Sequence, residues 1–283
     1  MNELRRDQIT LETRIIGGSV ILVLLLAFFA LYIEPDHTDL NFAWTILPRT
    51  SALLMGAGYT AGAYFFACVL FENKWHRVQA GFLAITGFTL CMLAATLLHL
   101  DRFHQGTLQF YLWTVIYAIT PLIVPFLWWR NHTSASENLE ENDFRFSLFI
   151  RRALGIIALA GVVSLLIVFV QPSILIKAAP WKLTELTARI FTGWSILICL
   201  TVLTTACDGR WSATRYLLQS GVVGIALVLM ALPRMWNDFD RTNPMTYVFI
   251  VSLVISLVGF IIIHLRLDIA SRLYAQQQAG ANK

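Results

Sequence analysis

IIGGSVILVLLLAFFALYI, residues 15–33, is an apolar stretch of 19 residues without a charged side chain. A helix of that length, at about 1.5 Å per residue, crosses the roughly 30 Å hydrocarbon core of a bilayer. Backbone groups in lipid must be hydrogen-bonded within their own segment, and the stretch lacks the alternation of a barrel strand. It is too long for the apolar part of a signal peptide, and no small-x-small cleavage site precedes Glu34. We interpret it as a retained first membrane-spanning helix.

Seven further apolar runs of similar length follow along the chain. The predicted spans are residues 15–33, 50–71, 79–98, 108–129, 153–171, 187–206, 212–232 and 245–265. Composition agrees, because 57% of the 283 residues are hydrophobic and only 13% are charged, about half the charged fraction of soluble domains. The sequence predicts an all-α, polytopic transmembrane helical bundle of eight spans.

The distribution of basic residues predicts the orientation. An even number of spans places both termini on one side, and that side carries two thirds of the 21 Lys and Arg residues. By the positive-inside rule we expect a multi-pass protein of the cell (cytoplasmic or inner) membrane with both termini cytoplasmic. The formal net charge of +4 follows from this bias. The sequence has no stripe of basic residues with aromatic residues between them, which is the pattern typical of nucleic-acid binding. We therefore expect the lipid bilayer, and not nucleic acid, as a partner.

An internal repeat is the second architectural prediction. A polar linker, residues 131–144, separates two groups of four spans, which align at an offset of 136 from Ser51 to Arg130 without a gap. The matched landmarks are Glu72 with Asp208, Trp75 with Trp211, Phe103 with Phe239, Tyr111 with Tyr247 and, with one residue of slack, Trp44 with Trp181. We predict a first four-helix repeat over residues 1–130, a cytoplasmic linker, and a second four-helix repeat with a short cytoplasmic tail over residues 145–283. Even-numbered units make the repeats parallel, related by a pseudo-two-fold axis along the membrane normal. The alternative is that interfacial tryptophans recur at helix ends in any polytopic protein.

The sequence offers little intramembrane chemistry. No Asp, Glu, Lys or Arg lies near the centre of a predicted span, which argues against a proton relay or a carboxylate-coupled pump. The six histidines lie in loops or at helix ends, which does not suit haem ligation, and the four cysteines lack C-x-x-C spacing. Metalloprotease and serine-hydrolase motifs are missing. We expect a protein that is not an enzyme and has no cofactor.

The densest polar group is predicted on the outer face. His99, Asp101 and His104 follow the third span, and His37 lies in the first outer loop. Imidazole and carboxylate are suitable ligands for a divalent metal, but the spacing matches no metal motif. We therefore expect no metal, and the alternative to these candidates is a solvated loop with Asp–Arg pairs and helix caps.

Two further groups concern the interior. Tyr59, Tyr111 and Tyr117 are predicted to line a polar interior between the second and fourth spans. Gly58 and Gly62 form a GxxxG pattern, which permits close contact between helices in lipid. That contact would lie within the bundle or, alternatively, between subunits.

Two short motifs carry a resemblance. WKLTELTAR (residues 181–189) and HLDRF (residues 99–103) resemble a group of uncharacterised bacterial multi-span membrane proteins. The resemblance implies a bacterial inner membrane and no known activity.

The sequence is compatible with two functions. The first is a non-enzymatic sensing, scaffolding or accessory membrane module with a membrane-protein partner or a second copy. The alternative is a transporter or permease for a small neutral or weakly polar solute, for which Pro121 and Pro125 in the fourth span would supply a kink. The permease predicts a cavity between the repeats, whereas the module predicts a packed, apolar interior.

Overall fold

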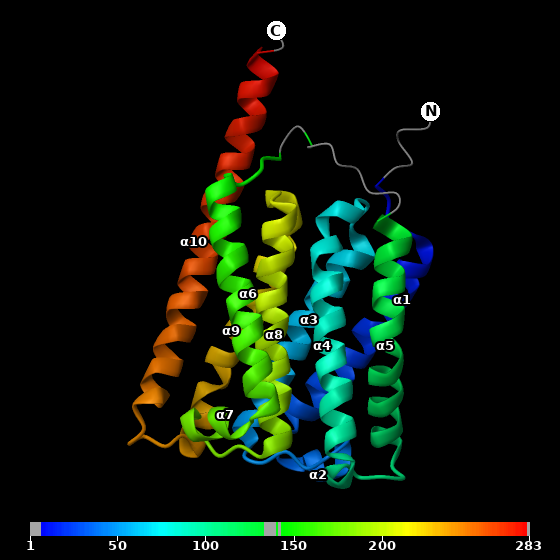
Figure 1. Cartoon of the computed structure of the whole chain (residues 1–283), viewed down its shortest axis with the longest axis vertical. Helices are drawn as coiled ribbons and strands as arrows, with labels where there is room; N and C mark the ends of the chain where they lie inside the picture. The colour runs from blue at the N-terminus through cyan, green and yellow to red at the C-terminus, as the bar shows by residue number, and fades with distance from the viewer. Residues whose placement is uncertain (1–6, 133–139, 141–142, 282–283) are drawn as a thin grey trace.

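The computed structural model describes residues 7–132, 140 and 143–281, and these residues are helical apart from turns, loops and two isolated β-bridges (Figure 1). Eight helices of the described chain are long and apolar enough to cross a membrane. The predicted all-α, multi-pass membrane protein of eight spans is confirmed. The spans are Leu11–Ile33, Arg49–Phe71, Gln79–Leu98, Leu108–His132, Leu148–Val170, Glu185–Asp208, Trp211–Asp238 and Pro244–Gln276.

The α-helices are numbered along the chain. They are α1 (Leu11–Phe28), α2 (Thr38–Asn41), α3 (Arg49–Phe71), α4 (Gln79–Leu98), α5 (Leu108–His132), α6 (Leu148–Val170), α7 (Ser173–Ala178), α8 (Glu185–Asp208), α9 (Trp211–Met235) and α10 (Pro244–Ala281). The largest departure from the predicted ends is in α10, which continues well past residue 265. Hydropathy falls there at Arg266, but Leu, Arg, Ala and Gln favour helix, and Arg272 pairs at 2.8 Å with Asp268 one turn earlier.

Hydroxyl side chains begin three of the spans. Thr10, Ser147 and Thr184 precede α1, α6 and α8, and each accepts a hydrogen bond from the backbone N–H three residues later. A helix leaves its first N–H groups without internal partners, so these caps stabilise the starts of the helices.

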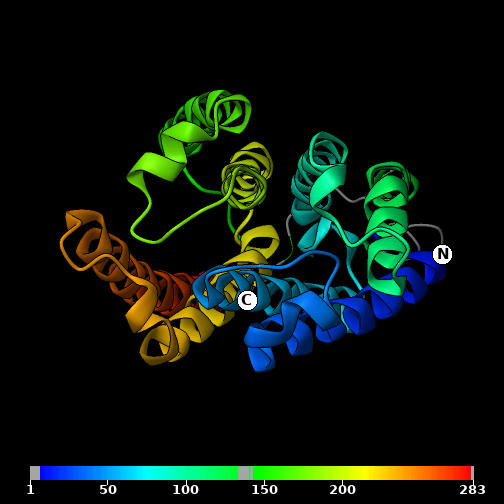
Figure 2. The ribbon, with the colours of Figure 1, turned by 90° about the horizontal axis from the view of Figure 1, so that it is seen from below.

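The spans form two layers of four helices. In one layer α3 packs between α1 and α9, and α9 also contacts α10; in the other α8 packs between α6 and α4, and α4 also contacts α5 (Figure 2). Each layer therefore takes two helices from each half of the chain. The halves are interleaved and do not form two separate bodies.

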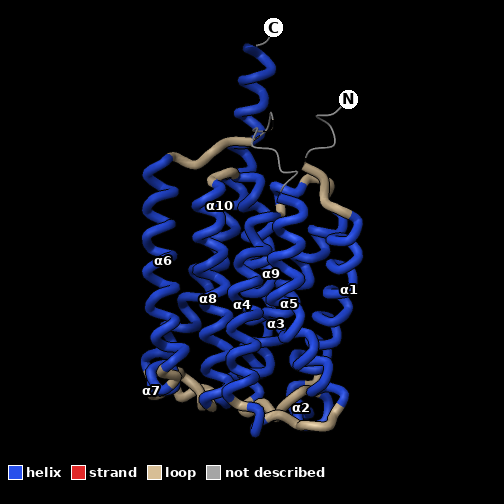
Figure 3. Tube along the Cα trace, turned by 45° about the vertical axis from the view of Figure 1, so that its right-hand side comes forward, coloured by secondary structure: helices blue, strands red, loops and turns tan. Residues whose placement is uncertain are grey.

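Both termini lie at the same end of the bundle (Figure 1). We call this end the termini face; it carries the start of α1 and the turns α3–α4 and α8–α9. The other end, the loop face, carries α2 and α7, and the spans run side by side between the two faces (Figure 3). Helix α10 extends beyond the other helices at the termini face.

Small residues bring the two halves into contact. On α8, a Cβ added to Gly193 would lie 2.4 Å from Met92 Cε and 3.1 Å from Cys91 Cβ of α4. On α9, a Cβ added to Gly224 would lie 3.1 Å from Ala61 Cβ of α3. Such close approach is the usual basis of helix association in lipid.

A cluster of aromatic rings fills the centre between the layers. The Trp194 ring of α8 lies 4.6 Å from Phe88 of α4 and 5.2 Å from Tyr59 of α3, centroid to centroid. Trp194 also covers Gly58, where an added Cβ would lie 2.9 Å from the indole. Side chains therefore connect both layers and both halves about midway along the spans.

Several contacts of the first half recur in the second half at an offset of 136 or 137. At the loop face, Trp44 lies 5.1 Å from Phe103 and 4.7 Å from Trp113. The corresponding Trp181 lies 5.8 Å from Phe239 and 5.3 Å from Phe249.

The ends of α3 and α8 at the termini face also match. Arg14 donates to the carbonyls of Leu70 and Glu72, both at 2.6 Å. Arg151, its counterpart in the second half, donates to the carbonyls of Ala206 and Cys207 at 2.9 and 2.5 Å. A cation at a helix C-terminus satisfies carbonyls that lack an intrahelical partner.

Candidate functional site

The richest polar cluster of the described chain lies at the termini face, around the turn that joins α3 to α4. Trp75 anchors this turn; it is fully buried, and its ring lies 4.7 Å from that of Phe82. The segment before α1 pairs with the turn, because Ile9 N–H donates to Asn73 O at 3.2 Å and Trp75 N–H to Asp7 O at 3.0 Å. The start of the chain's described part is thus fixed against the turn by backbone hydrogen bonds.

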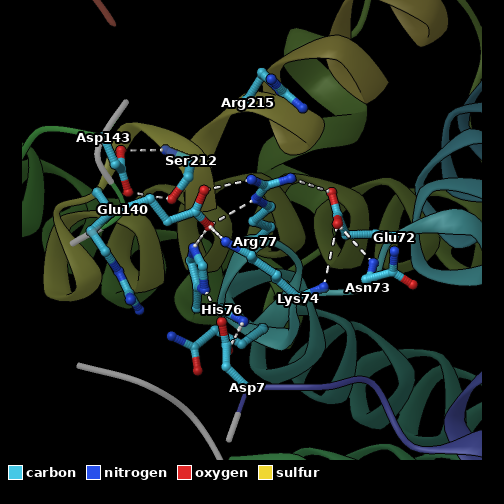
Figure 4. Close-up of polar contacts among 12 residues, drawn as sticks. Asp7, Glu72, Asn73, Lys74, His76, Arg77, Glu140, Asp143, Ser212 and Arg215 are labelled. Carbon is cyan, nitrogen blue, oxygen red and sulfur yellow. Dashed lines mark hydrogen bonds and ion pairs between the residues drawn. The ribbon is translucent and has the colours of Figure 1, made fainter. Parts of the chain in front are cut away.

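His76 lies between two carboxylates (Figure 4). Its Nδ1 is hydrogen-bonded to Asp7 Oδ2, and its Nε2 lies 2.9 Å from Glu140 Oε1. The second Asp7 oxygen accepts the His76 backbone N–H at 2.9 Å. The imidazole is 1% exposed, so both ring nitrogens depend on these protein partners.

Glu140, from the linker, is surrounded by cations. Arg77 donates to its two oxygens through Nε at 3.1 Å and Nη2 at 2.5 Å, and Lys74 Nζ lies 3.2 Å away. Arg77 also reaches Glu72 Oε2 at 3.0 Å. We call Asp7, Lys74, His76, Arg77 and Glu140 the His76 cluster.

The electrostatics of the cluster favour its ionised form. Burial would lower the pKa of His76, but the hydrogen bonds to Asp7 and Glu140 outweigh it and raise that pKa above its ordinary value. Burial would raise the pKa of Glu140, yet the hydrogen bonds from His76 and Arg77 hold it far below the usual range. These contacts therefore favour the charged forms of His76 and Glu140.

A simpler version of this arrangement lies at the turn between α8 and α9. Asp143 Oδ1 accepts the Ser212 backbone N–H at 3.0 Å, and Asp143 Oδ2 accepts the Ser212 hydroxyl at 2.5 Å (Figure 4). Phe146 N–H donates to Gly209 O at 2.8 Å and Trp211 N–H to Phe144 O at 3.1 Å, so the segment before α6 pairs with this turn. We call Asp143 and Ser212 the Ser212 pair.

The two groups fix chain segments that are distant in sequence. The His76 cluster joins the segment before α1, the α3–α4 turn and the linker. The Ser212 pair joins the end of the linker to the α8–α9 turn. This arrangement can hold segments in place and respond to protonation. In the part of the chain that the structure describes, no three His, Cys, Asp or Glu side chains are grouped to hold a metal ion.

The metal candidates from the sequence do not gather at the loop face. His37 Nδ1 lies 3.0 Å from Glu34 Oε2, and His104 Nε2 lies 3.1 Å from Thr45 Oγ1. Asp101 forms an ion pair with its neighbour Arg102 at 3.2 Å, and both side chains are exposed. These separate partners fit the alternative of a solvated loop.

His99, the fourth metal candidate, contacts a cation. Its Nε2 lies 2.6 Å from Arg189 Nη1, so this nitrogen accepts and is not protonated. Burial, and then the charge of Arg189, lower the pKa of His99. The contact joins the end of α4 to the start of α8.

The structure brings together two of the three tyrosines predicted to line the interior. The Tyr59 and Tyr117 hydroxyls are hydrogen-bonded at 3.0 Å, and both side chains are buried. Tyr111 is 56% exposed, and its assignment to the interior was wrong. Six residues separate it from Tyr117, which turns it about 120° away round the helix.

Gly58 and Gly62 face different helices of the same chain. Gly58 lies under Trp194 of α8, and a Cβ added to Gly62 would lie 3.2 Å from Leu24 of α1. Both glycines of the GxxxG pattern therefore pack inside the bundle, which was one of the two predicted uses.

No functional role was predicted from sequence for His76, Asp7 or Glu140. A signal was present, since the offset of 136 that relates Trp75 to Trp211 also relates Asp7 to Asp143. The offset of 136 thus pairs the two aspartates as well as the two turns, although Arg14 and Trp44, between Asp7 and the turn, match the second half at 137.

Comparisons with known proteins leave the activity open. No protein-family model, no curated protein and no solved structure matches the chain.

Proposed function

We propose that this protein is a non-enzymatic accessory or sensing module of the membrane, with the termini face, on the cytoplasmic side of the cell membrane, as its working surface. The observation that carries the proposal is the filled centre, where Trp194 packs on Gly58, Tyr59 and Phe88. A solute path between the halves would have to part these rings. The polar residues that join distant segments lie instead at the termini face.

We also propose that the module is a duplicated four-helix unit. Support comes from contacts that recur at an offset of 136 or 137: the aromatic groups around Trp44 and Trp181, the caps by Arg14 and Arg151, and the two aspartates of the termini face. Interfacial tryptophans alone would not reproduce the two arginine caps. The interleaved layers then place one unit against the other along most of the membrane thickness.

The alternative, a permease for a small neutral solute, has one favourable observation. Helix α5 contains Pro121 and Pro125, and the hydroxyls of Tyr59 and Tyr117 give the interior beside it a polar group. Proline removes a backbone hydrogen bond and favours a kink. A permease would expose this region to water from each side in turn.

The experiment is cysteine accessibility in oriented membranes, in a background without the four native cysteines. Ala57→Cys and Ile196→Cys place thiols at buried positions of α3 and α8. The module predicts that a membrane-impermeant thiol reagent labels neither from either side. Asp101→Cys, exposed at the loop face, is the control and should label from one side only. Labelling of Ala57→Cys or Ile196→Cys from either side would favour the permease.

The same reagent tests the orientation. Asn73→Cys, at an exposed position of the termini face, should label only from the cytoplasmic side, and Asp101→Cys only from the other. The reverse pattern would contradict cytoplasmic termini.

A further inference from the structure

The His76 cluster and the Ser212 pair share one construction. In each, an aspartate precedes a span and accepts the backbone N–H of the residue after a buried tryptophan, at 2.9 Å for His76 and 3.0 Å for Ser212. In each, the aspartate's second oxygen binds the side chain of that same residue. The two sites are thus two versions of one contact in one molecule.

The versions differ in the side chain that the aspartate binds and in the further partner of that side chain. Ser212 offers a hydroxyl, which keeps its proton through the physiological pH range, whereas His76 offers an imidazole, which titrates within it. The imidazole also reaches a second carboxylate, that of Glu140 in the linker, at 2.9 Å. The contact at His76 can therefore change in strength with pH near neutrality. The contact at Ser212 has no imidazole and lacks this response.

Charged groups surround His76 on every side. Asp7 comes from the segment before α1 and Glu140 from the linker, while Lys74 and Arg77 lie on its own turn and bind Glu140. From the α8–α9 turn, Arg210 acts on His76 through its charge and is itself paired with Asp208 at 2.7 Å.

Glu72 closes the cluster on the far side of Arg77, at 3.0 Å. Uncharged Gln79, in the first turn of α4, binds Asp208 at 2.7 Å and lies 3.3 Å from the ring of His132 at the end of α5. Arg210 thus has its own acidic partner in Asp208, whereas Lys74 and Arg77 share Glu140 with His76. The charge of His76 acts on both Asp7 and Glu140, and at Glu140 it adds to the charges of Lys74 and Arg77.

Only the protonated ring presents an N–H to both carboxylates, in the hydrogen bond of Nδ1 with Asp7 and in the ion pair of Nε2 with Glu140. A neutral imidazole carries one N–H, so either Asp7 or Glu140 would face a lone pair in place of a donor. A buried carboxylate that loses a donor is destabilised. When His76 loses its proton, its contact with Asp7 of the segment before α1, its contact with Glu140 of the linker, or both become weaker.

We propose that the His76 cluster is a pH-responsive clip, which fastens the segment before α1 and Glu140 of the linker to the termini face and loosens as pH rises, whereas the Ser212 pair stays fastened. The inference goes beyond the proposed function. It holds whether the bundle is an accessory module or a permease.

The direction follows from the ionisation of His76. Its folded pKa is raised above its ordinary value, so the stabilisation is complete below about pH 6.5, the ordinary histidine value. It declines as pH rises above that value and is lost once pH passes the folded pKa. Each unit between the folded and ordinary pKa corresponds to about a tenfold change in the fastening equilibrium.

The test is backbone hydrogen exchange of wild-type protein in nanodiscs between pH 6 and 9, corrected for the intrinsic effect of pH. The amides of Trp75 and His76 report the first site, and those of Trp211 and Ser212 report the second. We expect protection at the first site to fall with pH, by up to about tenfold per unit of pKa difference. Protection at the second should stay constant. Flat protection at the first site, or a parallel fall at both, would overturn the proposal.

Two variants refine the test. His76→Ser gives the first site the side chain of the second, and it should remove the pH dependence there. Ser212→Ala is the matched control, which should lower protection at the second site equally at every pH. An unchanged pH slope in His76→Ser would also overturn the proposal. Should His76→Ser not fold, the comparison of the two sites within the wild-type protein still decides it.

Discussion

At the scale of single residues, the hydrogen bond between the Tyr59 and Tyr117 hydroxyls stands out because it is buried in lipid-embedded protein. The two oxygens lie 3.0 Å apart, between α3 and α5. Neither hydroxyl has another hydrogen-bond partner among the described residues. Each therefore depends on the other, and removing one leaves a buried polar group without a partner.

Because each hydroxyl depends on the other, we expect the effects of substituting the two tyrosines on the free energy of unfolding to be non-additive. Tyr59→Phe and Tyr117→Phe should each lower the free energy of unfolding by about 1–3 kcal/mol, the usual cost of a buried unpaired hydroxyl. The double variant should cost clearly less than the sum of the two, because it leaves no orphan. Denaturant unfolding in detergent of all four proteins measures this. Additive losses would mean that the hydroxyls act independently.

The tyrosine group was inferred from residue chemistry and not from helical spacing. The structure brings Tyr59 and Tyr117 together, because both face the space between the layers. Tyr111 does not, since the prediction weighed its chemistry and overlooked its angle round the helix. His76 was missed because its partners lie in the segment before α1 and in the linker, far from it along the chain, and no local pattern connects them.

At the scale of helices, glycine positions decide how closely the halves approach. Gly193 of α8 faces α4, where an added Cβ would lie 2.4 Å from Met92 Cε and 3.1 Å from Cys91 Cβ. Gly259 of α10 has nothing within 4 Å of an added Cβ. The two glycines share a helical backbone and differ in their surroundings.

Alanine substitutions at Gly193 and Gly259 can therefore be compared directly, with Gly259 as the control. Gly193→Ala should lower the free energy of unfolding by about 1–3 kcal/mol, because Met92 Cε must move aside and Cys91 of α4 must shift by a few tenths of an ångström to admit the methyl group. Gly259→Ala should cost nothing and gain up to about 1 kcal/mol from helix propensity. Thermal unfolding of both variants in the same detergent checks this. Equal effects would show that the α4–α8 contact does not depend on Gly193.

Which residues form spans could be predicted from sequence, but which spans touch could not. Runs such as residues 15–33 are long and apolar enough to require a helix, and hydropathy located all eight. The order within the layers depends on small residues such as Gly193 and Gly224 meeting side chains of the other half. Hydropathy does not indicate which residues of different helices contact each other. The end of α10 was underestimated for a related reason, since its last turns are helical although their hydropathy is low.

At the scale of the whole molecule, the interleaving of the halves is the feature with the widest consequence. Helices α3 and α9 lie in one layer and α4 and α8 in the other, so each half contacts its counterpart in both layers. The Trp194 cluster then joins the layers about midway along the spans. A rocking motion of one half against the other would break all three contacts together. We therefore expect the bundle to occupy one arrangement of its halves.

The most direct test is the distance between the halves at each face, measured by double electron–electron resonance in nanodiscs. Spin labels at Leu11 and Leu148 report the termini face, and labels at Asp101 and Asn237 the loop face; all four positions are exposed. The native cysteines are replaced in both double variants. A bundle with one arrangement of its halves should give a single narrow distance distribution for each pair. Two populations whose distances change in opposite senses at the two faces would contradict it and establish the alternating movement of a permease.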